Sequence, residues 1–225
     1  MSNTTTESAA RRTREPQATR AKILEAAFGE IYRCGFQAAS LDRILAQAGV
    51  TKGALYHHFP DKASLGYALV DEVVRGFLLE RWLGPLEAST GDPLAALQRT
   101  LRLRGTSITA HEVELGCPLN NLAQEMSPLD EEFRRRIDAI FDEWRDGFAG
   151  ALVRAQAAGT VREDVDAQQV AAFLVAAAEG SFGLAKGARS RKMFRSNMEL
   201  LVDYLDTLRP AAKRHGTGAV SRTRG

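Results

Sequence analysis

Polar and basic side chains gather in a short stretch of the sequence, residues 40–62, and their types suit contact with nucleic acid. Lys52 can reach a base edge or a phosphate, while nearby hydroxyl and imidazole groups can bond phosphate oxygens. These groups belong to Ser40, Thr51, Tyr56 and His57. Gly53 has no side chain, which would let a DNA backbone or base approach closely. The alternative is that a helix merely tolerates this glycine, at a cost of about 1 kcal/mol relative to alanine.

Lys62 lies in the first turn of an expected helix, where a cation opposes the positive end of the helix dipole. A phosphate docked at that end would attract both the lysine and the free backbone N–H groups. The position therefore favours a phosphate contact, and the alternative is an ordinary solvated surface lysine.

Catalytic motifs are incomplete throughout the chain. His111 and Glu112 resemble half of an HExxH zinc site, but position 115 is leucine, so the second ligand is missing. Residues 180–183 do not complete a GxSxG nucleophile motif, because Glu179 precedes them. Residues 216–218 resemble the start of a dinucleotide loop, yet no strand precedes them and no helix follows. We therefore expect no enzyme activity and no cofactor.

The two cysteines, Cys34 and Cys117, cannot form a disulfide framework, and no CxxC pair indicates zinc. Cys117 has two interpretations, a sensor of oxidants or electrophiles and a small buried apolar residue. Cys34 ends an amphipathic helix and is expected to pack. His57 and His58 are helix neighbours whose side chains point apart, so we expect no metal site.

The elements that must position residues 40–62 are short helices. Apolar residues at helical spacing predict a first helix that ends near Cys34 and Gly35. Ser40 is a predicted N-cap for a helix over residues 41–48, which Gly49 ends. A further helix over residues 51–58 stops before Pro60. Two short helices joined by a glycine turn are the geometry of a helix-turn-helix, whose second helix enters the DNA major groove.

The remainder of the chain also has helical periodicity, and no alternating strand pattern is present. Asp61 is a predicted cap for a helix that ends before Gly84. Later helices are expected over residues 92–112, 118–126, 128–158, 167–189 and 191–208. The fold class is all-α. We expect a disordered arm (1–15), a helix-turn-helix domain (16–62), a ligand-binding and dimerisation domain (63–209) and a basic disordered tail (210–225).

Charge is distributed unevenly along the 225 residues, although the whole chain carries only +2. Nine basic and six acidic residues give residues 1–62 a net charge of +3, and the tail carries +4, which leaves −5 for residues 63–209. A basic front joined to an acidic body suggests a polyanion-binding module attached to a module with another task. The N-terminus lacks the apolar segment of a signal peptide, and the apolar run 167–178 is too short to span a bilayer. These features favour a cytoplasmic protein that does not bind membranes.

Residues 19–65 resemble the DNA-binding domain of TetR-family (tetracycline-repressor-like) transcriptional regulators. The match includes the break at Gly35 and Phe36, the turn over residues 48–50, and the pattern Gly53-x-Leu-Tyr-x-His-Phe-x-x-Lys62. The resemblance implies a three-helix helix-turn-helix domain followed by a divergent helical domain for ligand binding and dimerisation. It further implies that Ser40 anchors the second helix to the DNA backbone. The residues it places against the operator are Thr51, Lys52, Gly53, Tyr56, His57 and Lys62.

The expected ligand pocket and dimer seam lie in the second domain. Aromatic residues of the helix over 128–158 either pack in the core or line a ligand pocket. In a pocket they would face polar groups of the preceding helix. The candidate ligand residues are Asn120, Asn121, Gln124, Phe141, Trp144 and Phe182. Small residues along one side of the helix over 167–189, with apolar residues of the last helix, would form a four-helix dimer interface. The candidate interface residues are Ala176, Gly180, Gly183, Gly187, Met198, Leu201 and Leu205.

Together these patterns predict a homodimeric, ligand-responsive regulator that binds a palindromic DNA operator and is released by an unidentified small-molecule effector. The family resemblance favours a repressor over an activator. The helix that begins at Asp61 is expected to be the only link between the two domains, with Phe77 and Trp82 reaching the body. The alternative is a helical-bundle carrier or enzyme with a vestigial helix-turn-helix, which would not bind DNA upstream of its own gene.

Overall fold

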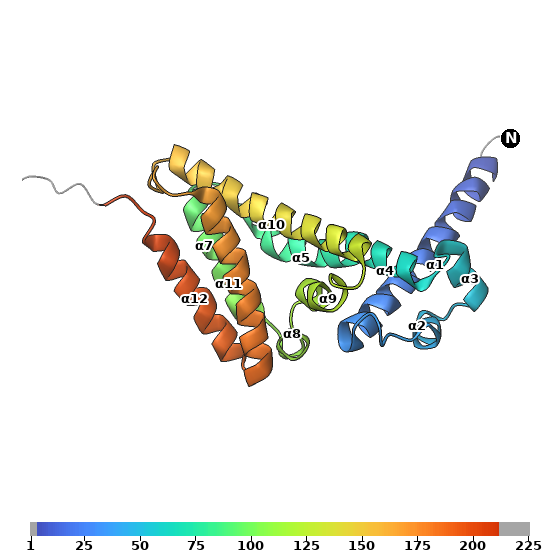
Figure 1. Cartoon of the computed structure of the whole chain (residues 1–225). Coiled ribbons are helices and arrows are strands. Elements are labelled where there is room, and N and C mark those ends of the chain that lie inside the picture. The colour runs from blue at the N-terminus through green and yellow to red at the C-terminus, as the bar shows by residue number, and fades with distance from the viewer. Residues whose placement is uncertain (1–3, 212–225) are drawn as a thin grey trace, which may run out of the picture.

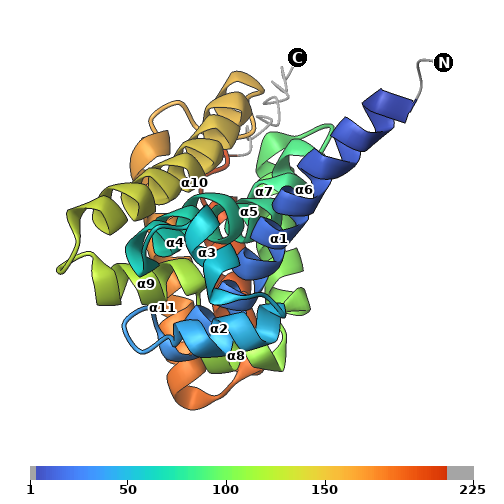
Figure 2. The same cartoon turned by 90° about the vertical axis from the view of Figure 1, so that its right-hand side faces the viewer.

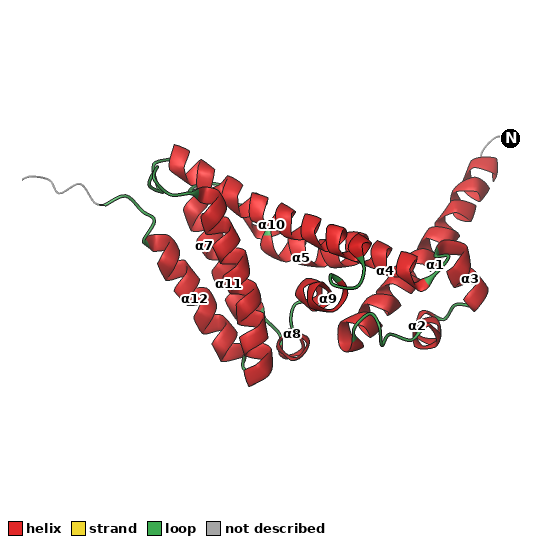
Figure 3. Cartoon of the chain, viewed as in Figure 1, coloured by secondary structure: helices red, strands yellow, loops and turns green. Residues whose placement is uncertain are grey.

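The computed structural model describes residues 4–211, and every regular element in that range is a helix (Figure 3). The predicted all-α fold is confirmed. The first elements are α1 (Thr4–Cys34), α2 (Leu41–Ala48), α3 (Lys52–His58), α4 (Lys62–Ala68), η1 (Leu69–Val74), α5 (Arg75–Trp82) and α6 (Gly84–Glu87). They are followed by α7 (Pro93–Ser107), α8 (Ala110–Leu115), α9 (Pro118–Met126), α10 (Glu131–Ala157), α11 (Ala167–Ala188) and α12 (Arg191–Asp206).

The helices α1 to α4 form one end of an elongated molecule, and α7, α11 and α12 form the other (Figure 1). The long helix α10 and the continuous helical run formed by α4, η1 and α5 extend between the two ends. In the small domain, α1 packs on α2, α3 and α4, because each helix turns an apolar side toward a shared core. Ile23, Ile44, Leu55 and Leu65 are almost completely buried there. This core fixes the helix-turn-helix as a rigid unit.

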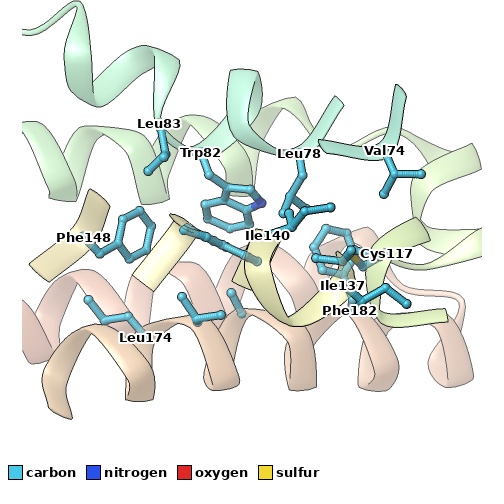
Figure 4. Packing of buried hydrophobic residues seen from close by; sticks show 14 of the residues in the cluster. Val74, Leu78, Trp82, Leu83, Cys117, Ile137, Ile140, Phe148, Leu174 and Phe182 are labelled. Atoms are coloured by element: carbon cyan, nitrogen blue, oxygen red, sulfur yellow. The ribbon is translucent and has the colours of Figure 1, made fainter. Parts of the chain in front are cut away.

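The core of the large domain is built around α5, α10 and α11 (Figure 4). The rings of Trp82 and Trp144 lie 4.6 Å apart, and Phe148 packs edge-on against both. On the far side, α12 packs against α7 and α11. The stripe of aromatic residues on α10 is therefore mainly core.

The structure corrects three expectations about the elements. Residues 4–15 belong to α1 and are not a disordered arm, because few apolar residues argue against burial but not against a helix rich in Ala, Arg and Glu. The helix expected over 92–112 is two helices, since Thr109 caps α8 and exchanges capping-box hydrogen bonds with Glu112. The helix from Asp61 contains a π-helical segment, η1. Residues 212–225 of the expected tail lie outside the described residues.

By length and composition alone, α11 is the one helix in the range 4–211 that could cross a membrane. The helix has 22 residues, so it is longer than the apolar run counted in the sequence. Half of its apolar window is buried against the rest of the chain, where it packs on α10 and α12. Its composition fits a helix of the protein core.

Candidate nucleic-acid interface

Local capping sets the geometry of α2 and α3. The Ser40 side chain accepts a hydrogen bond from the backbone N–H of Arg43, 3.4 Å away, which confirms the predicted N-cap. Gly49 ends α2 in the left-handed region at φ +65°, where glycine costs least. The Thr51 hydroxyl then caps α3 by accepting from the N–H of Ala54 at 3.2 Å. The short turn between the two helices is therefore specified by local sequence.

The helix α3 presents a polar side to solvent and an apolar side to the core. Leu55 and Phe59 are buried, which orients the opposite side of the helix outward. The exposed residues on and just before α3 include Thr51, Lys52, Gly53, Tyr56 and His57. Figure 2 looks onto this end of the molecule, where α2 and α3 face the viewer. The structure thus brings five of the predicted DNA-contact residues to one accessible surface.

Gly53 is not required by any close contact within the protein. A Cβ atom built at this position would meet only the Thr51 Oγ1, at 3.9 Å, which is ordinary van der Waals distance. Since no neighbouring atom demands glycine, the internal packing does not explain why a helix of seven residues contains one. The surface at Gly53 therefore has room for a close approach by an external group.

The Lys62 side chain is engaged within the protein, whereas the sequence suggested either a phosphate contact or a solvated surface lysine. Its Nζ donates hydrogen bonds to the carbonyl oxygens of Gln37 at 3.0 Å and Ala39 at 2.7 Å. The ammonium also lies 5.1 Å from the centre of the Phe36 ring. Lys62 therefore ties the start of α4 to the loop before α2, and it is not a solvated surface lysine.

Glu30 is a structural residue of the site that sequence reasoning missed. Its buried carboxylate accepts from Arg43 Nε at 2.7 Å, from an Arg33 guanidinium N–H at 2.7 Å and from the backbone N–H of Ser40 at 3.2 Å. The Arg43 hydrogen bond is the main reason why the pKa of Glu30 falls to about 2, despite the opposing effect of burial. Glu30 thereby holds the N-terminus of α2 on α1. The spacing of Glu30 and Arg33, three residues apart on one helix, is the sequence feature that could have indicated this ion pair.

A second carboxylate, Glu125 on α9, joins the large domain to the loop before α2. It accepts hydrogen bonds from the backbone N–H groups of Phe36 and Gln37, both at 2.8 Å. Gly35 has φ +84°, and a Cβ there would lie 2.7 Å from a Glu125 carboxylate oxygen. Gly35 is therefore needed both for the backbone turn and for the close approach of the carboxylate. We name these two hydrogen bonds the Glu125 clamp.

Other contacts also join the domains, so the helix from Asp61 is not the only link. The Tyr32 hydroxyl of α1 donates to the Gly116 carbonyl at 2.6 Å, and the Glu125 clamp is a second such link. The helix from Asp61 adds a contact of its own, in which the Tyr67 hydroxyl donates to Asp130 at 2.8 Å. The ring of Phe77 packs on Phe28 of α1, 5.5 Å away, so Phe77 contributes a contact to the small domain. Trp82 does reach the large-domain core.

Replacing Gly35 with alanine is expected to lower the free energy of unfolding by about 2–4 kcal/mol, since it adds a left-handed alanine and a clash with the Glu125 clamp. Gly159 is the matched control, because it has φ +71° and open space around a Cβ. Gly159→Ala should lower the free energy of unfolding only through the strain of a left-handed alanine, by about 1–2 kcal/mol. Urea unfolding of both variants measures the difference. Equal losses at the two glycines would contradict the clamp.

The candidate ligand residues do not surround a single cavity. Asn121 and Gln124 line a pocket of about 460 Å³ between α1, η1 and α9. Asn120 lies within 3.5 Å of Gln124 but does not line that pocket. Trp144 is fully buried in the core, Phe182 packs on Phe194 at 4.5 Å, and Phe141 is half-buried on α10. Two of the six side chains thus line this pocket and the other four do not, because periodicity does not distinguish pocket residues from core.

The candidate dimer residues also divide into two groups. Met198, Leu201 and Leu205 are buried inside the protomer, so they are core and not a surface seam. The small residues of α11 are exposed, as the prediction requires: Ala176, Gly180, Gly183 and Gly187. Large exposed apolar residues accompany them on α11 and α12, namely Phe173, Leu184, Met193 and Leu200. An apolar surface on these two helices remains available for a partner.

Cys117 is completely enclosed and faces a buried carboxylate, that of Glu179 on α11. Burial is the main cause that raises the pKa of the Cys117 thiol well above its usual value. A thiol that resists ionisation is a poor nucleophile, so the arrangement favours the packing interpretation over the sensor. Neither carboxylate oxygen of Glu179 has a hydrogen-bond partner within the described residues.

Glu179→Gln is expected to stabilise the protein at alkaline pH. Burial raises the pKa of Glu179 from 4.5 to about 7, so the folded state holds this proton more tightly than the unfolded state. Stability therefore falls as the pH rises between these values, by about 3 kcal/mol in total. Urea unfolding should show the variant more stable than wild type at pH 8.5 and nearly equal at pH 4.5. Glu163→Gln is the control, because Glu163 is exposed and its substitution should leave the pH dependence of unfolding unchanged. If Glu179→Gln raised the free energy of unfolding equally at both pH values, the raised pKa of Glu179 would be contradicted.

No group of three or more His, Cys, Asp or Glu side chains that could hold a metal ion occurs within residues 4–211. The rings of His57 and His58 lie 5.2 Å apart on α3. The residues 216–218, noted for a partial dinucleotide pattern, fall outside the described part of the chain.

Two short capped helices, with the second exposed and polar, define the helix-turn-helix class of DNA-binding proteins. Residues 23–69 match the family described as bacterial regulatory proteins, tetR family. Residues 93–199 match the C-terminal domain of LmrA/YxaF-like transcriptional regulators. The chain belongs to the TetR family, and it is a DNA-binding transcriptional regulator and not an enzyme.

Curated relatives and solved structures agree with this membership. The chain is 31% identical over 177 residues to the regulator TtgR of Pseudomonas putida, covering 76% of this chain and 81% of TtgR. It is 29% identical over 195 residues to the regulator AcuR of Cereibacter sphaeroides, covering 86% of this chain and 83% of AcuR. A crystal structure of a TetR regulatory protein from Rhodobacter sphaeroides matches with a TM-score of 0.73 and 26% identity, covering 82% of this chain and 97% of that one.

Proposed function

We propose that this regulator acts in the cytoplasm as a homodimer, that it represses transcription from a palindromic operator, and that a small molecule releases it. Members of the family bind DNA operators and typically act as dimers with small-molecule effectors. One curated relative is named a repressor, DhaR of Mycobacterium, which is 28% identical over 159 residues and matches 70% of this chain and 77% of DhaR. The assignment to a repressor follows that relative.

The single observation that carries the DNA-binding proposal is the exposed side of α3. Lys52 and Gly53 lie together at its first turn, where recognition helices contact base edges. Thr51, Tyr56 and His57 extend the same surface with groups that suit phosphate oxygens. Ser40 and Lys62 support the interface from the flanks, Ser40 as the cap of α2 and Lys62 through its carbonyl contacts with the intervening loop.

The homodimer is proposed from the exposed apolar surface of α11 and α12. Four of the eight large exposed apolar residues in the described chain lie on these two helices. An exposed patch of this kind is typical of an interface. Two copies of the pair related by a two-fold axis would form a four-helix interface. Ala176, Gly180, Gly183 and Gly187 would allow the helices of the two protomers to approach closely.

Release by an effector requires coupling between the domains. An effector can weaken operator binding only if it binds the DNA-incompetent form more tightly, and the operator then weakens effector binding by the same factor. The Glu125 clamp and the bonds of Tyr32 and Tyr67 are contacts through which a shift of the large domain would move the loop before α2. A changed spacing of the two α3 helices would then prevent both from docking at once.

The test is the fluorescence anisotropy of a labelled duplex from the region upstream of the protein's own gene. We expect saturable binding by the dimer that survives an excess of unrelated duplex, because specific sites bind at least about 10³-fold more tightly. Added protein should also lower transcription from that promoter in vitro, whereas an activator would raise it. Equal affinity for both duplexes would contradict the proposal and favour a helical carrier.

A further inference from the structure

The pocket of about 460 Å³ between α1, η1 and α9 lies where the two domains meet. Its volume is in the range of sites that bind small molecules. One part of the wall is apolar and aromatic, formed by Phe28 and Tyr32 of α1, Leu69 and Val74 of η1, and Pro118 and Leu122 of α9, and polar side chains form the rest. Such a wall suits the apolar body of a small molecule.

Most polar groups that line this pocket already have partners within the protein. The Tyr32 hydroxyl donates to Gly116, and Asn121 Nδ2 donates to the Leu115 carbonyl at 2.8 Å. The Glu125 carboxylate is engaged in the clamp, and Arg33 is paired with Glu30 at 2.7 Å. These groups leave little unused hydrogen-bonding capacity.

Gln124 and Lys186 keep more capacity: Gln124 forms one long hydrogen bond to Asn120, and Lys186 is an exposed cation at the end of α11. The Lys186 Nζ donates to the carbonyl oxygen of Leu115 at 3.0 Å, which is a neutral acceptor. Among the described residues, Lys186 forms no ion pair with a carboxylate. An ammonium has three donors, so it retains capacity for an anionic acceptor. The pocket therefore combines an apolar wall with one cation that lacks a counter-charge.

We propose that this pocket binds a small molecule with an apolar body and a single carboxylate, and that Lys186 receives the carboxylate. This inference rests on the proposed function, since the ligand would be the effector. Gly35 and Glu125 line the same pocket, so an occupant touches the Glu125 clamp directly. A second carboxylate in the same pocket as that of Glu125 would weaken the clamp by like-charge repulsion. The loop before α2 would then be freer to move, which lowers operator affinity.

The first arm of the test uses three probes with one body and different charges: 4-phenylbutyrate, 4-phenylbutan-1-ol and 4-phenylbutylamine. Isothermal titration calorimetry on the full-length protein should show the carboxylate binding about tenfold more tightly than the alcohol, since a hydrogen bond to a charged group exceeds a neutral one. Lys186→Met should remove that preference. Lys192→Met, an exposed lysine on α12, should retain it. Lack of a carboxylate preference, or its persistence in Lys186→Met, would overturn the proposal.

The second arm locates the site through Cys34, which lines the pocket and is half-buried, while Cys117 is enclosed. Saturating 4-phenylbutyrate should slow alkylation of Cys34 by N-ethylmaleimide. Binding without protection of Cys34 would place the ligand elsewhere and overturn the proposal.

The third arm separates this inference from the function on which it rests. Ligand-free protein should bind its operator, and 4-phenylbutyrate should weaken that binding in wild type but not in Lys186→Met. Failure of the ligand-free protein to bind DNA would refute the proposed function. Intact operator binding that 4-phenylbutyrate does not change would refute only the effector site.

Discussion

Gly53→Leu is expected to reduce operator affinity by more than about a hundredfold while the protein stays folded. The exposed position tolerates a side chain within the protomer, because a Cβ there meets nothing closer than 3.9 Å. A leucine would instead hold α3 away from the floor of the major groove. Each lost base contact costs about 1–3 kcal/mol, and the dimer loses contacts at both half-sites. Lys52→Ala should give a smaller loss, because it removes contacts without adding an obstruction.

Fluorescence anisotropy at one fixed salt concentration measures this effect, since affinity for DNA depends steeply on salt. Circular dichroism checks the fold. Gly76→Leu is the matched control, because Gly76 is an exposed helical glycine on α5 with open space around it. Wild-type operator affinity in both Gly53→Leu and Lys52→Ala would exclude α3 as the recognition helix.

Gly183→Leu is expected to convert the dimer into monomers that bind one half-site weakly. Gly183 is exposed on α11 and a Cβ there has open space, so the substitution should leave the protomer intact. At a two-fold interface each added side chain meets the partner helix, and an overpacked seam cannot relax without separating the helices. The loss of the second half-site should lower operator affinity by several orders of magnitude.

Sedimentation velocity at micromolar concentration distinguishes the two states, and Gly76→Leu should sediment as the wild type does. A wild-type protein that is monomeric under these conditions would refute the interface on α11 and α12. A Gly183→Leu variant that stays dimeric would move the interface to another surface.

Local chemistry explains why much of the small domain was predictable from sequence. The caps formed by Ser40 and Asp61 and the left-handed turn at Gly49 depend on residues within three or four positions of one another. The polar side of α3 follows in the same way from helical periodicity. The break near Ile108 was missed because apolar periodicity continues across it, although Thr109 and Glu112 form a recognisable capping box.

Long-range contacts explain what the sequence could not show. The Glu125 clamp joins residues 89 and 88 positions apart, and Lys62 bonds carbonyl groups 25 and 23 positions away. Periodicity places Met198 and Leu201 on an apolar side of α12 but does not say whether that side faces the protomer core or a partner. The structure buries both and leaves Leu200 exposed instead. The same ambiguity assigned Trp144 to a pocket, although it belongs to the core.

Selection of binding sequences from a random pool of duplex DNA, with the full-length protein, tests the central claim most directly. We expect enrichment of one inverted repeat whose half-sites lie one helical turn apart, roughly 34–36 Å, or a multiple of that distance. The repeat should be bound by one dimer and lost from selections with Gly53→Leu. Enrichment of no sequence, or of a single motif without an inverted copy, would contradict a two-fold operator-binding regulator.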